Sequence, residues 1–443
     1  MALSGLDIYK LLPKTNCREC GFATCLAFAM QLAKKSISIE KCPYLSPESK
    51  VRLEASSLPP IRLITVGEGE SKLQIGNETV LFRHEEKFHH PCGIGFILKD
   101  SLSDEELKKK VALINNFQLE RVGQHLSVDL IALKQEKAKS RFIDALKIVL
   151  ANTKLNLVLM SQDPVALKEA LVLSSGRRPL VYKITKENLS SLLPVIKEFK
   201  VPVVAESNDI SSLSELTQTL AKEGIEEIVV DTGLKPVAQK ILDLTQVRSL
   251  SLKKSQRSLG YPFLTITSES DNYAQTEEAA TYISKYAGIV LLNHFDPACV
   301  LSLLTLRQNI YTDPQKPLQI EPKLYPIGKT DKNSPLLVTT NFSLSYYTVL
   351  GEVEASKIPS YILSVDTEGM SVLTAWAAEK FNAEKITEAM KKFEVEASVS
   401  KKSIIIPGYL AVMSGDLQEQ SGWEVIVGPK EAAGIPSFLK NIN

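Results

Sequence analysis

The sequence predicts a multidomain α/β protein with three parts: a small helical domain (residues 1–58), a central TIM-type (β/α)8 barrel (residues 61–320) and a C-terminal doubly wound α/β domain (residues 326–443). Four of the six cysteines lie within residues 17–42, where short helices are expected. Short β-rich apolar runs alternate with helical segments through the middle of the chain. Prolines gather on either side of that middle part, and the strand–helix alternation resumes after the second group.

The N-terminal domain is predicted from its leucine-rich lead-in and its cysteine segment. Residues 23–34 have helical composition, and Cys25 falls within them. Prolines then interrupt regular structure at Pro43, Pro47, Pro59 and Pro60. We therefore expect residues 45–60 to link this domain to the next one.

The central barrel is predicted from eight β-rich runs. They are residues 61–66, 95–99, 128–133, 155–160, 179–184, 201–206, 226–231 and 288–293. Helical patterns separate most of them, at residues 104–115, 137–151, 165–173 and 210–223. Strands that are buried on both faces and alternate with helices indicate a parallel sheet, and eight such units have the size of a TIM barrel. A Gly-Asn pair within residues 71–88 predicts a hairpin at one end of the barrel.

The C-terminal domain follows a proline-rich boundary at residues 314–326. Strands are expected at residues 336–340, 360–365, 403–407 and 423–427, and helices at residues 371–381 and 409–420. This order is typical of a small doubly wound domain, in which ligands bind beyond the carboxyl ends of the strands. The loops at those ends carry glycine and small hydroxyl residues, which suit a large ligand with many amide groups. Ordinary helix caps explain the same residues, so composition alone leaves both interpretations open.

Composition and charge narrow the classes of partner. The chain has 44% hydrophobic residues and a formal net charge of +1, which suits a globular protein with a core. Such a charge gives no electrostatic reason to expect nucleic acid or an anionic membrane as a partner. No apolar run is long enough to cross a bilayer, and the N-terminus lacks the pattern of a secretory signal. A cytoplasmic protein is therefore expected, with the isolated Cys92 and Cys299 simply buried.

The remaining cysteines, Cys17, Cys20, Cys25 and Cys42, have the spacing C-x2-C-x4-C-x16-C. Zinc sites usually pair two C-x2-C turns, whereas three thiolates close in sequence and a fourth far downstream suit the corners of a 4Fe–4S cube. Thiolates bind zinc and iron–sulfur clusters alike, so zinc stays open as an alternative. Disulfides fit a cytoplasmic chain less well. We predict a 4Fe–4S cluster, and hence a protein that handles single electrons.

Several motifs that would indicate other chemistry are absent from the sequence. There is no G-x-G-x-x-G at a strand-to-helix turn, no Walker-type phosphate loop and no G-x-S-x-G elbow. Glu206, Asp231 and Asn293 lie at expected strand ends of the barrel, where enzymes of this fold keep catalytic groups. They form no evident acid–base or pterin-binding set, and we interpret them as structural.

Four segments together resemble one protein family across the whole chain. They are NCRECGFATCLAFA with Cys42-Pro43, VTTNFSLSYY, TEGMSVLTAW and PGYLAVMSGDLQEQSGWEV. With the barrel-like middle, they are similar to the large (gamma) subunit family of corrinoid iron–sulfur proteins. That family serves the acetyl-CoA decarbonylase/synthase, or reductive acetyl-CoA, system of anaerobes.

The resemblance implies a methyl-group carrier, which acts as one subunit of a methyltransferase and synthase system. A cobalamin-type corrinoid, bound base-off, would take a methyl group from methyltetrahydrofolate on a separate methyltransferase and pass it to acetyl-CoA synthase. The 4Fe–4S cluster would use a low-potential electron donor to return Co(II) to Co(I). The barrel would pack against a homologous barrel in a smaller subunit, which gives a heterodimer.

The resemblance also implies which residues hold the corrinoid. Carried onto this sequence, the contacts are Thr340, Tyr346, Met370, Ser371, Val372, Leu373, Thr374 and Gly434. Thr374 would lie near the lower face of cobalt. The D-x-H-x-x-G signature, whose histidine binds cobalt in many cobalamin domains, is missing from the sequence. Its absence suits a carrier of Co(I), because the filled axial orbital of Co(I) is disfavoured by a strong axial donor.

Two other functions remain open at this point. One is a pterin-binding barrel methyltransferase whose cluster is only structural. The other is a ferredoxin-like electron carrier or scaffold without corrinoid. Corrinoid absorption bands in protein purified without oxygen would separate the methyl carrier from both.

Overall fold

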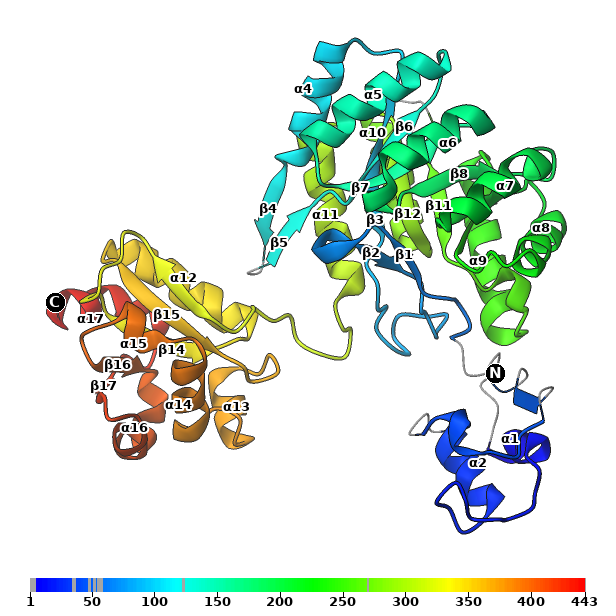
Figure 1. The fold of residues 1–443 in the computed structure, drawn as a ribbon. Helices are drawn as coiled ribbons and strands as arrows, with labels where there is room; N and C mark the ends of the chain where they lie inside the picture. The colour runs from blue at the N-terminus through cyan, green and yellow to red at the C-terminus, as the bar shows by residue number, and fades with distance from the viewer. Residues whose placement is uncertain are drawn as a thin grey trace. The chain divides into compact units, whose positions relative to one another are not determined.

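The computed structural model describes residues 5–33, 37–46, 49–50, 53, 59–121, 124–268 and 271–442. The chain forms two compact units (Figure 1). One is made of Met1–Gln118 with Ser127–Tyr311, and the other of Leu119–Leu126 with Thr312–Asn443. Most of the predicted linker, residues 45–60, lies outside the described residues, and the three predicted domain ranges stay predictions.

Two helices form the N-terminal part, α1 (Gly5–Leu11) and α2 (Cys25–Ala33). Buried Ile8 in α1 belongs to the same small core as Phe28 and Ala29 in α2. The helical composition of residues 23–34 therefore corresponds to α2. Cys25 is the first residue of that helix, so its backbone position is fixed by the helix start.

The middle of the chain is a closed barrel of eight parallel strands, as predicted. In barrel order the strands are β3 (Gly93–Lys99), β6 (Leu130–Lys134), β7 (Asn156–Met160), β8 (Leu180–Ile184), β9 (Val203–Glu206), β10 (Ile228–Asp231), β11 (Phe263–Ile266) and β12 (Ala287–Leu292). Neighbours in this order are also neighbours in the sequence, which is the topology of a (β/α)8 barrel. Cys92 and Cys299 are buried, as expected.

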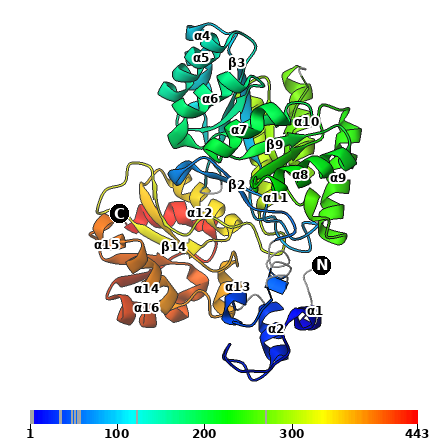
Figure 2. The same ribbon diagram turned by 45° about the vertical axis from the view of Figure 1, so that its right-hand side comes forward.

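Each barrel strand is followed by a helix on the outside of the barrel (Figure 2). The helices are α4 (Asp104–Asn115), α5 (Lys139–Asn152), α6 (Pro164–Leu173), α7 (Leu189–Phe199), α8 (Ile210–Lys222), α9 (Val237–Lys253), α10 (Asn272–Ser284) and α11 (Pro297–Tyr311). The four helices predicted from the sequence are confirmed. Their starts have chemical signals, such as the capping box in which Ser103 and Glu106 bond each other's backbone N–H.

Two predictions about the barrel are wrong. Residues 61–66 are not a barrel strand, because β1 (Ile64–Val66) pairs antiparallel with β2 (Leu73–Ile75) in a separate two-stranded sheet. The eighth barrel strand is β11, which was missed because its apolar run is only four residues long. The hairpin expected within residues 71–88 is wrong too, since β2 has β1 as its partner and the described residues 77–88 contain no strand.

The β1–β2 hairpin is nevertheless part of the barrel core. Ile64, Val66 and Ile75 are buried in one cluster with inward-facing barrel residues such as Leu130 and Val158. Hydrophobic alternation is the same for a strand inside the barrel sheet and for one that covers its end. The apolar pattern of residues 61–66 therefore predicted a buried strand correctly, but it assigned that strand to the barrel sheet instead of to a pair with β2.

Shorter elements lie in several parts of the chain. The strands β4 (Gln118–Arg121) and β5 (Gln124–Ser127) pair in a two-stranded sheet, most of which belongs to the unit that contains Thr312–Asn443. Among the described residues, the 3₁₀ helices are Ile39–Lys41, Gly69–Ser71, Ser175–Arg177, Arg257–Leu259, Gly408–Met413 and Ala432–Gly434.

The C-terminal part is built on a five-stranded sheet in the order β13-β15-β14-β16-β17. The strands are β13 (Leu324–Ile327), β14 (Leu336–Thr340), β15 (Ser360–Val365), β16 (Ser403–Ile406) and β17 (Glu424–Val427). All neighbours are parallel except β13, which is an antiparallel edge strand. The four predicted strands are confirmed, and β13 was missed. Because the chain moves from β14 to β15 in one direction and to β16 in the other, the topological switch point lies between β14 and β16.

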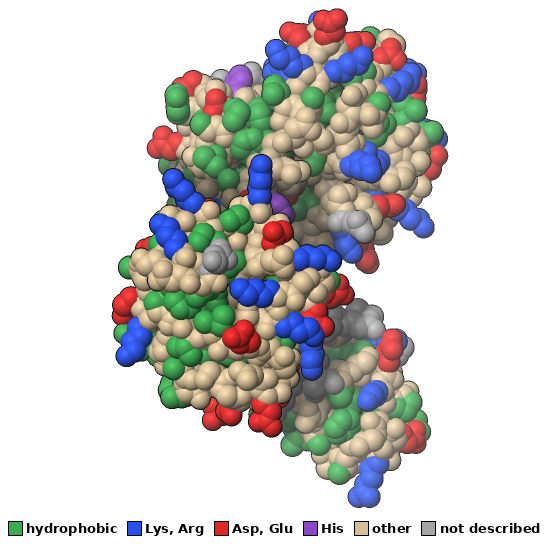
Figure 3. All heavy atoms as spheres, turned by 90° about the vertical axis from the view of Figure 1, so that its left-hand side faces the viewer, with side chains coloured by type: hydrophobic (Ala, Val, Ile, Leu, Met, Phe, Trp, Pro, Cys, Tyr) green, Lys and Arg blue, Asp and Glu red, His purple; other side chains and the backbone are tan. Residues whose placement is uncertain are grey.

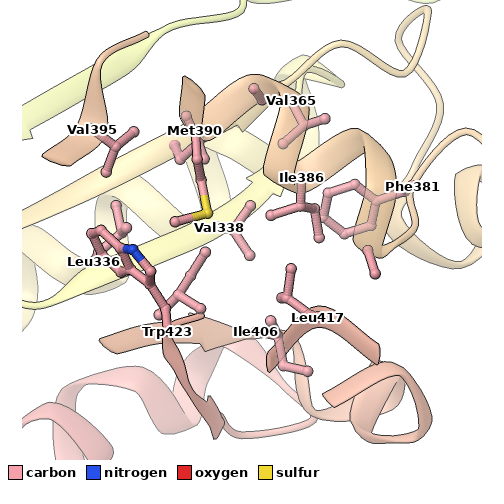
Figure 4. Packing of buried hydrophobic residues seen from close by; sticks show 14 of the residues in the cluster. Leu336, Val338, Val365, Phe381, Ile386, Met390, Val395, Ile406, Leu417 and Trp423 are labelled. Atoms are coloured by element: carbon pink, nitrogen blue, oxygen red, sulfur yellow. The ribbon is translucent and has the colours of Figure 1, made fainter. Parts of the chain in front are cut away.

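Helices cover both faces of this sheet (Figure 1). One face carries α12 (Ser343–Ser356) and α17 (Ile435–Ile442). The other carries α13 (Val372–Ala377), α14 (Ala383–Lys392), α15 (Val395–Ser398) and α16 (Ser414–Ser421). On this second face, strand residues such as Val338 and Ile406 meet Ile386 and Trp423 in a continuous core (Figure 4). The predicted helix 371–381 is shorter than expected, and 409–420 divides into a 3₁₀ helix and α16.

The surface mixes charges of both signs. On the face drawn in Figure 3, lysine and arginine side chains are interspersed with acidic and apolar ones. No helix among the described residues has the length and hydrophobicity needed to span a membrane. The expected cytoplasmic location and the expected absence of a nucleic-acid partner stay predictions.

Candidate functional site

The four clustered cysteines surround one side of the small N-terminal core. Cys25 is buried at the start of α2, Cys20 and Cys42 are half-buried against the same core, and Cys17 is exposed. This gradient of exposure leaves one edge of the site open to solvent. A ligand set that is partly buried and accessible at one edge suits a centre that exchanges electrons with a partner.

The loop between α1 and α2 owes its shape to left-handed backbone positions. Asn16 and Arg18 have φ of +49° and +67°, and Gly21 has φ of +84°. Asn16 is held by its side chain, because its Oδ1 accepts a hydrogen bond from the backbone N–H of Cys25 at 2.8 Å. The loop thus brings Cys17 back towards the helix start that carries Cys25.

A second hydrogen bond connects the remote cysteine to the other three. The hydroxyl of Tyr44, two residues after Cys42, donates to Glu19 Oε1 at 2.8 Å. Glu19 lies between Cys17 and Cys20 in the sequence. This hydrogen bond therefore holds the segment of Cys42 beside the segment of Cys17 and Cys20, although sixteen residues separate Cys42 from Cys25 in the sequence.

Electrostatics agree that the four sulfurs are near one another. Burial raises the pKa of the Cys42 thiol, and the negative charges of Cys20, Cys25 and Cys17 raise it further. Thiolates this close repel one another, so they stay ionised only beside a positive charge. Iron would supply that charge. Among the described residues no three His, Cys, Asp or Glu side chains are arranged to hold a single metal ion. A 4Fe–4S cube is larger than one ion and takes its cysteines at separate corners, so the residues present fit a cluster.

A cavity of about 330 Å³ lies at the switch point of the C-terminal sheet. The strands β14 and β16 pair there through one residue pair, Leu337 and Ile405, and both residues line the cavity. The other walls come from the first two turns of α12, from Ser371–Leu373, and from the loops 407–409 and 428–430. This is the crevice in which doubly wound folds bind their ligands.

Backbone forms one wall of this cavity. Gly408 and Gly428 lie so close that a Cβ on Gly408 would be 2.5 Å from the carbonyl oxygen of Gly428. Gly408 N also donates to Pro429 O at 3.0 Å, which joins the two loops. Any side chain at position 408 would push the loops apart and change the shape of the cavity.

Two paired strand residues at the cavity have unsatisfied hydroxyls. Thr339 lines the cavity and is 1% exposed, and its Oγ1 has no hydrogen-bond partner among the described residues. The buried Oγ of Ser364, its register partner on β15, has none among them either. A buried hydroxyl without a partner costs about 1–3 kcal/mol. The rest of the lining is mostly apolar, with hydroxyl residues at Ser345, Thr348 and Ser371.

Of the residues predicted to hold the ligand, Ser371, Val372 and Leu373 line the cavity. Thr374 follows them on α13, is exposed, and its hydroxyl lies 2.9 Å from that of Ser371. Met370 is half-buried just before them. Gly434 is half-buried beside the wall loop, where a Cβ would lie 2.8 Å from Cβ of Pro429. These positions are close to the cavity, and their roles stay predictions.

Thr340 and Tyr346, like Met370, Thr374 and Gly434, are not among the lining residues, and these two are buried. Thr340 is fully buried at the end of β14, and its Oγ1 is also unpaired among the described residues. Tyr346 is 4% exposed in the core beneath α12, with its ring centroid 4.8 Å from that of Tyr325. Burial raises the pKa of Tyr346 above its usual range, so its hydroxyl stays protonated. The structure gives Tyr346 a packing role, and its contact with a ligand stays a prediction.

Sequence reasoning missed much of the cavity wall on α12. Leu344, Ser345 and Thr348 line it, and none of the three is among the contacts that the resemblance implies. Their spacing of three and four residues was the available signal for a helix face. Asn341, just before this helix, was not among the predicted contacts.

The barrel has a cavity of its own, about 530 Å³, at the carboxyl ends of its strands. The polar groups around it are bonded to one another. Tyr182 donates to Glu206 at 2.9 Å and to Asp231 at 3.1 Å, and the buried Lys240 bonds Asp231 at 2.5 Å. Burial raises the pKa of Tyr182 well above its usual range, so it remains a donor. The two carboxylates act as acceptors within this network, in line with a structural role.

Two family models match this chain. Residues 63–439 match the family model "CO dehydrogenase/acetyl-CoA synthase delta subunit". Residues 12–44, which include the four cysteines, match a second model, "Putative Fe-S cluster". The barrel is also similar to the dihydropteroate synthase of Thermus thermophilus, with 12% identity and a TM-score of 0.39 over 56% of this chain and 100% of that chain. This last likeness is too weak to carry an argument.

Two relatives are similar over their full length. The corrinoid/iron-sulfur protein large subunit of Moorella thermoacetica is 46% identical over 441 residues, 99% of each chain. The acetyl-CoA decarbonylase/synthase complex subunit gamma of Methanocaldococcus jannaschii is 34% identical over 469 residues, 99% of this chain and 96% of that one. The chain therefore belongs to the family of corrinoid/iron–sulfur protein large subunits.

Proposed function

We propose that this chain is a methyl-group carrier of the CO dehydrogenase/acetyl-CoA synthase system, with an iron–sulfur cluster and a corrinoid as cofactors. The observation that carries the proposal is the presence of two cofactor sites in one chain. Four cysteines surround the N-terminal core, and an apolar cavity lies at the switch point of the C-terminal sheet. A cobalt corrinoid supplies a metal that accepts and releases a methyl group, and a cluster supplies single electrons to keep that metal reduced.

The C-terminal residues suit a corrinoid bound base-off. Residues 312–443 contain no histidine, so this part of the chain offers cobalt no imidazole ligand. Thr374, beside the cavity, presents a hydroxyl, which is a much weaker donor. In base-off binding, the nucleotide base of the corrinoid does not coordinate cobalt and needs a place of its own. The apolar cavity between β14 and β16 offers a slot for that flat base. The hydroxyl residues Ser345 and Thr348 in its lining can bond polar groups there.

Membership of this family also suggests which proteins this chain works with. The relative from Methanocaldococcus jannaschii is named as a subunit of a complex, and we infer that this chain works in one too. We propose a smaller homologous barrel subunit, a methyltransferase that binds methyltetrahydrofolate, acetyl-CoA synthase and a low-potential electron donor as its partners. The barrel of this chain then acts as scaffold and docking surface, which fits the internally bonded groups at its mouth.

A substitution that fills the cavity tests the corrinoid site. Ser345 lines the cavity from α12, and Ala355 is exposed on the same helix outside the lining. In protein made with corrinoid and the partner subunit and purified without oxygen, the wild type should contain about one corrinoid per cluster. Ser345→Trp should reduce the corrinoid at least tenfold and leave the iron content unchanged. Ala355→Trp should keep both.

Other results would sink the proposal. A wild-type protein that contains iron but takes up no cobalt would be the ferredoxin-like carrier. Retention of methyltetrahydrofolate by the isolated barrel-containing chain, without cobalt, would favour the pterin-binding methyltransferase. Equal corrinoid content in the two tryptophan variants would place the corrinoid elsewhere.

A further inference from the structure

One buried side chain, that of Asn341, joins the end of β14 to the loop before α13. It is 1% exposed. Its Oδ1 accepts hydrogen bonds from the backbone N–H groups of Thr367 at 2.9 Å and Gly369 at 3.0 Å, and from the Thr367 hydroxyl at 2.9 Å. Its Nδ2 donates to Gln319 Oε1 and Asp366 Oδ1, both at 3.3 Å. A single amide therefore connects three segments that are distant in the sequence.

The backbone of Asn341 is fixed as well. Its N–H donates to Val365 O at 2.9 Å, which extends the ladder between β14 and β15. Its carbonyl oxygen accepts from Ile320 N at 2.8 Å, and Ser343 N donates to Leu318 O at 3.0 Å. The side chain consequently projects from a rigid point, and the loop must adapt to it.

The loop contains a tight left-handed turn. Glu368 and Gly369 have φ of +55° and +75°, and Met370 N donates to Thr367 O at 3.2 Å to close the turn. Glycine adopts positive φ freely, whereas a glutamate in this region is disfavoured. The conformation of Glu368 must therefore be imposed by the surroundings of the turn.

Few contacts hold Glu368 in this left-handed conformation. The carboxylate of Asp366 accepts the N–H of Glu368 at 3.0 Å, and the same oxygen is bonded by Asn341. A Cβ on Gly369 would lie 2.6 Å from the side chain of Gln319, so the turn also packs closely against that segment. An exposed ion pair of Glu368 with Lys380 at 2.6 Å adds little, because water screens it. Within the turn, the Thr367 hydroxyl also lies 3.1 Å from Met370 O, whereas Asn341 bonds the turn from a neighbouring strand end, at Thr367 and at Gly369.

The turn leads directly into the cavity wall. Ser371, Val372 and Leu373 follow it, and α13, which they open, has only six residues. A helix this short cannot orient its first turn independently of the loop before it. We propose that Asn341 is a positioning residue, which sets the left-handed turn and thereby places Ser371–Leu373 for corrinoid binding. This inference rests on the corrinoid-binding function proposed above.

Three variants separate positioning from general stability. Asn341→Ala removes the whole set of side-chain bonds to the loop. Asn341→Asp keeps an accepting oxygen for Thr367 and Gly369 but replaces the donor with a carboxylate oxygen that faces Asp366. Asn382→Ala is the matched control, because Asn382 caps α14 in the same domain by accepting from Lys385 N at 2.9 Å.

Hydrogen exchange of the full chain without corrinoid reports on the turn itself. In Asn341→Ala the amides of Thr367 and Gly369 should exchange at least tenfold faster than in the wild type. Asn341→Asp should fall between the two, and Asn382→Ala should match the wild type at these amides. Unchanged exchange in Asn341→Ala would overturn the inference.

Binding of hydroxocobalamin to the full chain reports on the cavity. Asn341→Ala should bind it at least tenfold more weakly and with an altered visible circular dichroism spectrum, because the ring would sit in a changed wall. Asn382→Ala should keep the wild-type affinity and spectrum. An equal loss in Asn382→Ala would make the effect one of stability and refute positioning. If Asn341→Ala does not fold, the same criteria apply to Asn341→Asp.

The two proposals can fail separately. A wild type that takes up no hydroxocobalamin would refute the proposed function, and this inference with it. A wild type that binds it, next to an Asn341→Ala variant with unchanged affinity and exchange, would refute the inference alone.

Discussion

At the scale of single residues, the proposal of a base-off corrinoid depends on which side chains the C-terminal part offers to cobalt. The absence of histidine from residues 312–443 could be read from the sequence, and so could the small residues around Thr374. The roles of Asn341 and Thr339 could not. Both belong to a run of polar residues, Thr339-Thr340-Asn341, in which nothing in the sequence says which side chain faces the cavity. Only the strand register and the loop contacts separate them.

A histidine placed at Thr374 should change the cobalt centre. The Co(II) EPR spectrum of the wild type is expected to lack hyperfine coupling to an axial nitrogen. Thr374→His should introduce such coupling and make reduction to Co(I) more difficult, because imidazole is a strong axial donor. Ala377→His, on the same helix and also exposed, is the control and should leave the spectrum unchanged.

Nitrogen coupling already present in the wild type would contradict base-off binding. The same new coupling from both histidine variants would show that the position of Thr374 near cobalt is wrong.

Helices and strands were predictable where their pattern was long. The predicted helix 104–115 coincides with α4, and the strands 336–340 and 360–365 coincide with β14 and β15. Failures fell on elements whose identity depends on a distant partner. The short β11 becomes a strand because β10 and β12 lie on either side of it. The strand β1 has an ordinary apolar pattern, and its pairing with β2 rather than with the barrel is a tertiary choice.

The position of β1 within the barrel core leads to a stability prediction. Ile64 is 1% exposed and packs in the barrel cluster, whereas its neighbour Leu63 is 40% exposed. Ile64→Ala should lower the free energy of unfolding of the barrel by about 2–5 kcal/mol through lost packing and a residual cavity. Leu63→Ala should change it by about 0.5 kcal/mol or less. Urea unfolding followed by circular dichroism measures both.

Similar small losses in the two variants would mean that the β1–β2 hairpin lies against the barrel without contributing to its core. A large loss in Leu63→Ala would mean that this exposed residue is covered by a partner chain.

At the scale of the whole molecule, the cysteine site, the barrel and the C-terminal cavity follow one another along the sequence. The cysteine site, the barrel and the cavity each lie within a continuous stretch, and the order of the three stretches was evident from composition, spacing and proline punctuation. The two sites differ in how far the sequence predicts the residues that form them. Sequence spacing predicts the ligands Cys17, Cys20, Cys25 and Cys42, because ligand chemistry is a property of residue type. The cavity is a property of packing, and no spacing encodes it.

The proposed electron transfer from cluster to cobalt predicts a selective defect. Cys20→Ala should abolish reactivation of oxidised cobalt by the electron donor, because one cluster ligand is lost. Methyl transfer to and from cobalt that has been reduced beforehand should remain intact. Stopped-flow absorption of the corrinoid, with and without prior chemical reduction, measures the two activities. Cys92→Ala, which changes a buried cysteine of the barrel, is the control.

An equal loss of both activities in Cys20→Ala would make the cluster a structural element. Full reactivation in that variant would mean that electrons reach cobalt without the cluster.

The backbone wall at Gly408 and Gly428 has a consequence for how such proteins diverge. The spacing of the two loops is set by main chain, so side chains beside Gly408 can change over evolutionary time while the loops keep that spacing. Gly408 itself is sensitive to replacement, because a Cβ there would lie 2.5 Å from the carbonyl oxygen of Gly428. Low overall identity between two members of the family is therefore a poor guide to whether the spacing of these loops has changed.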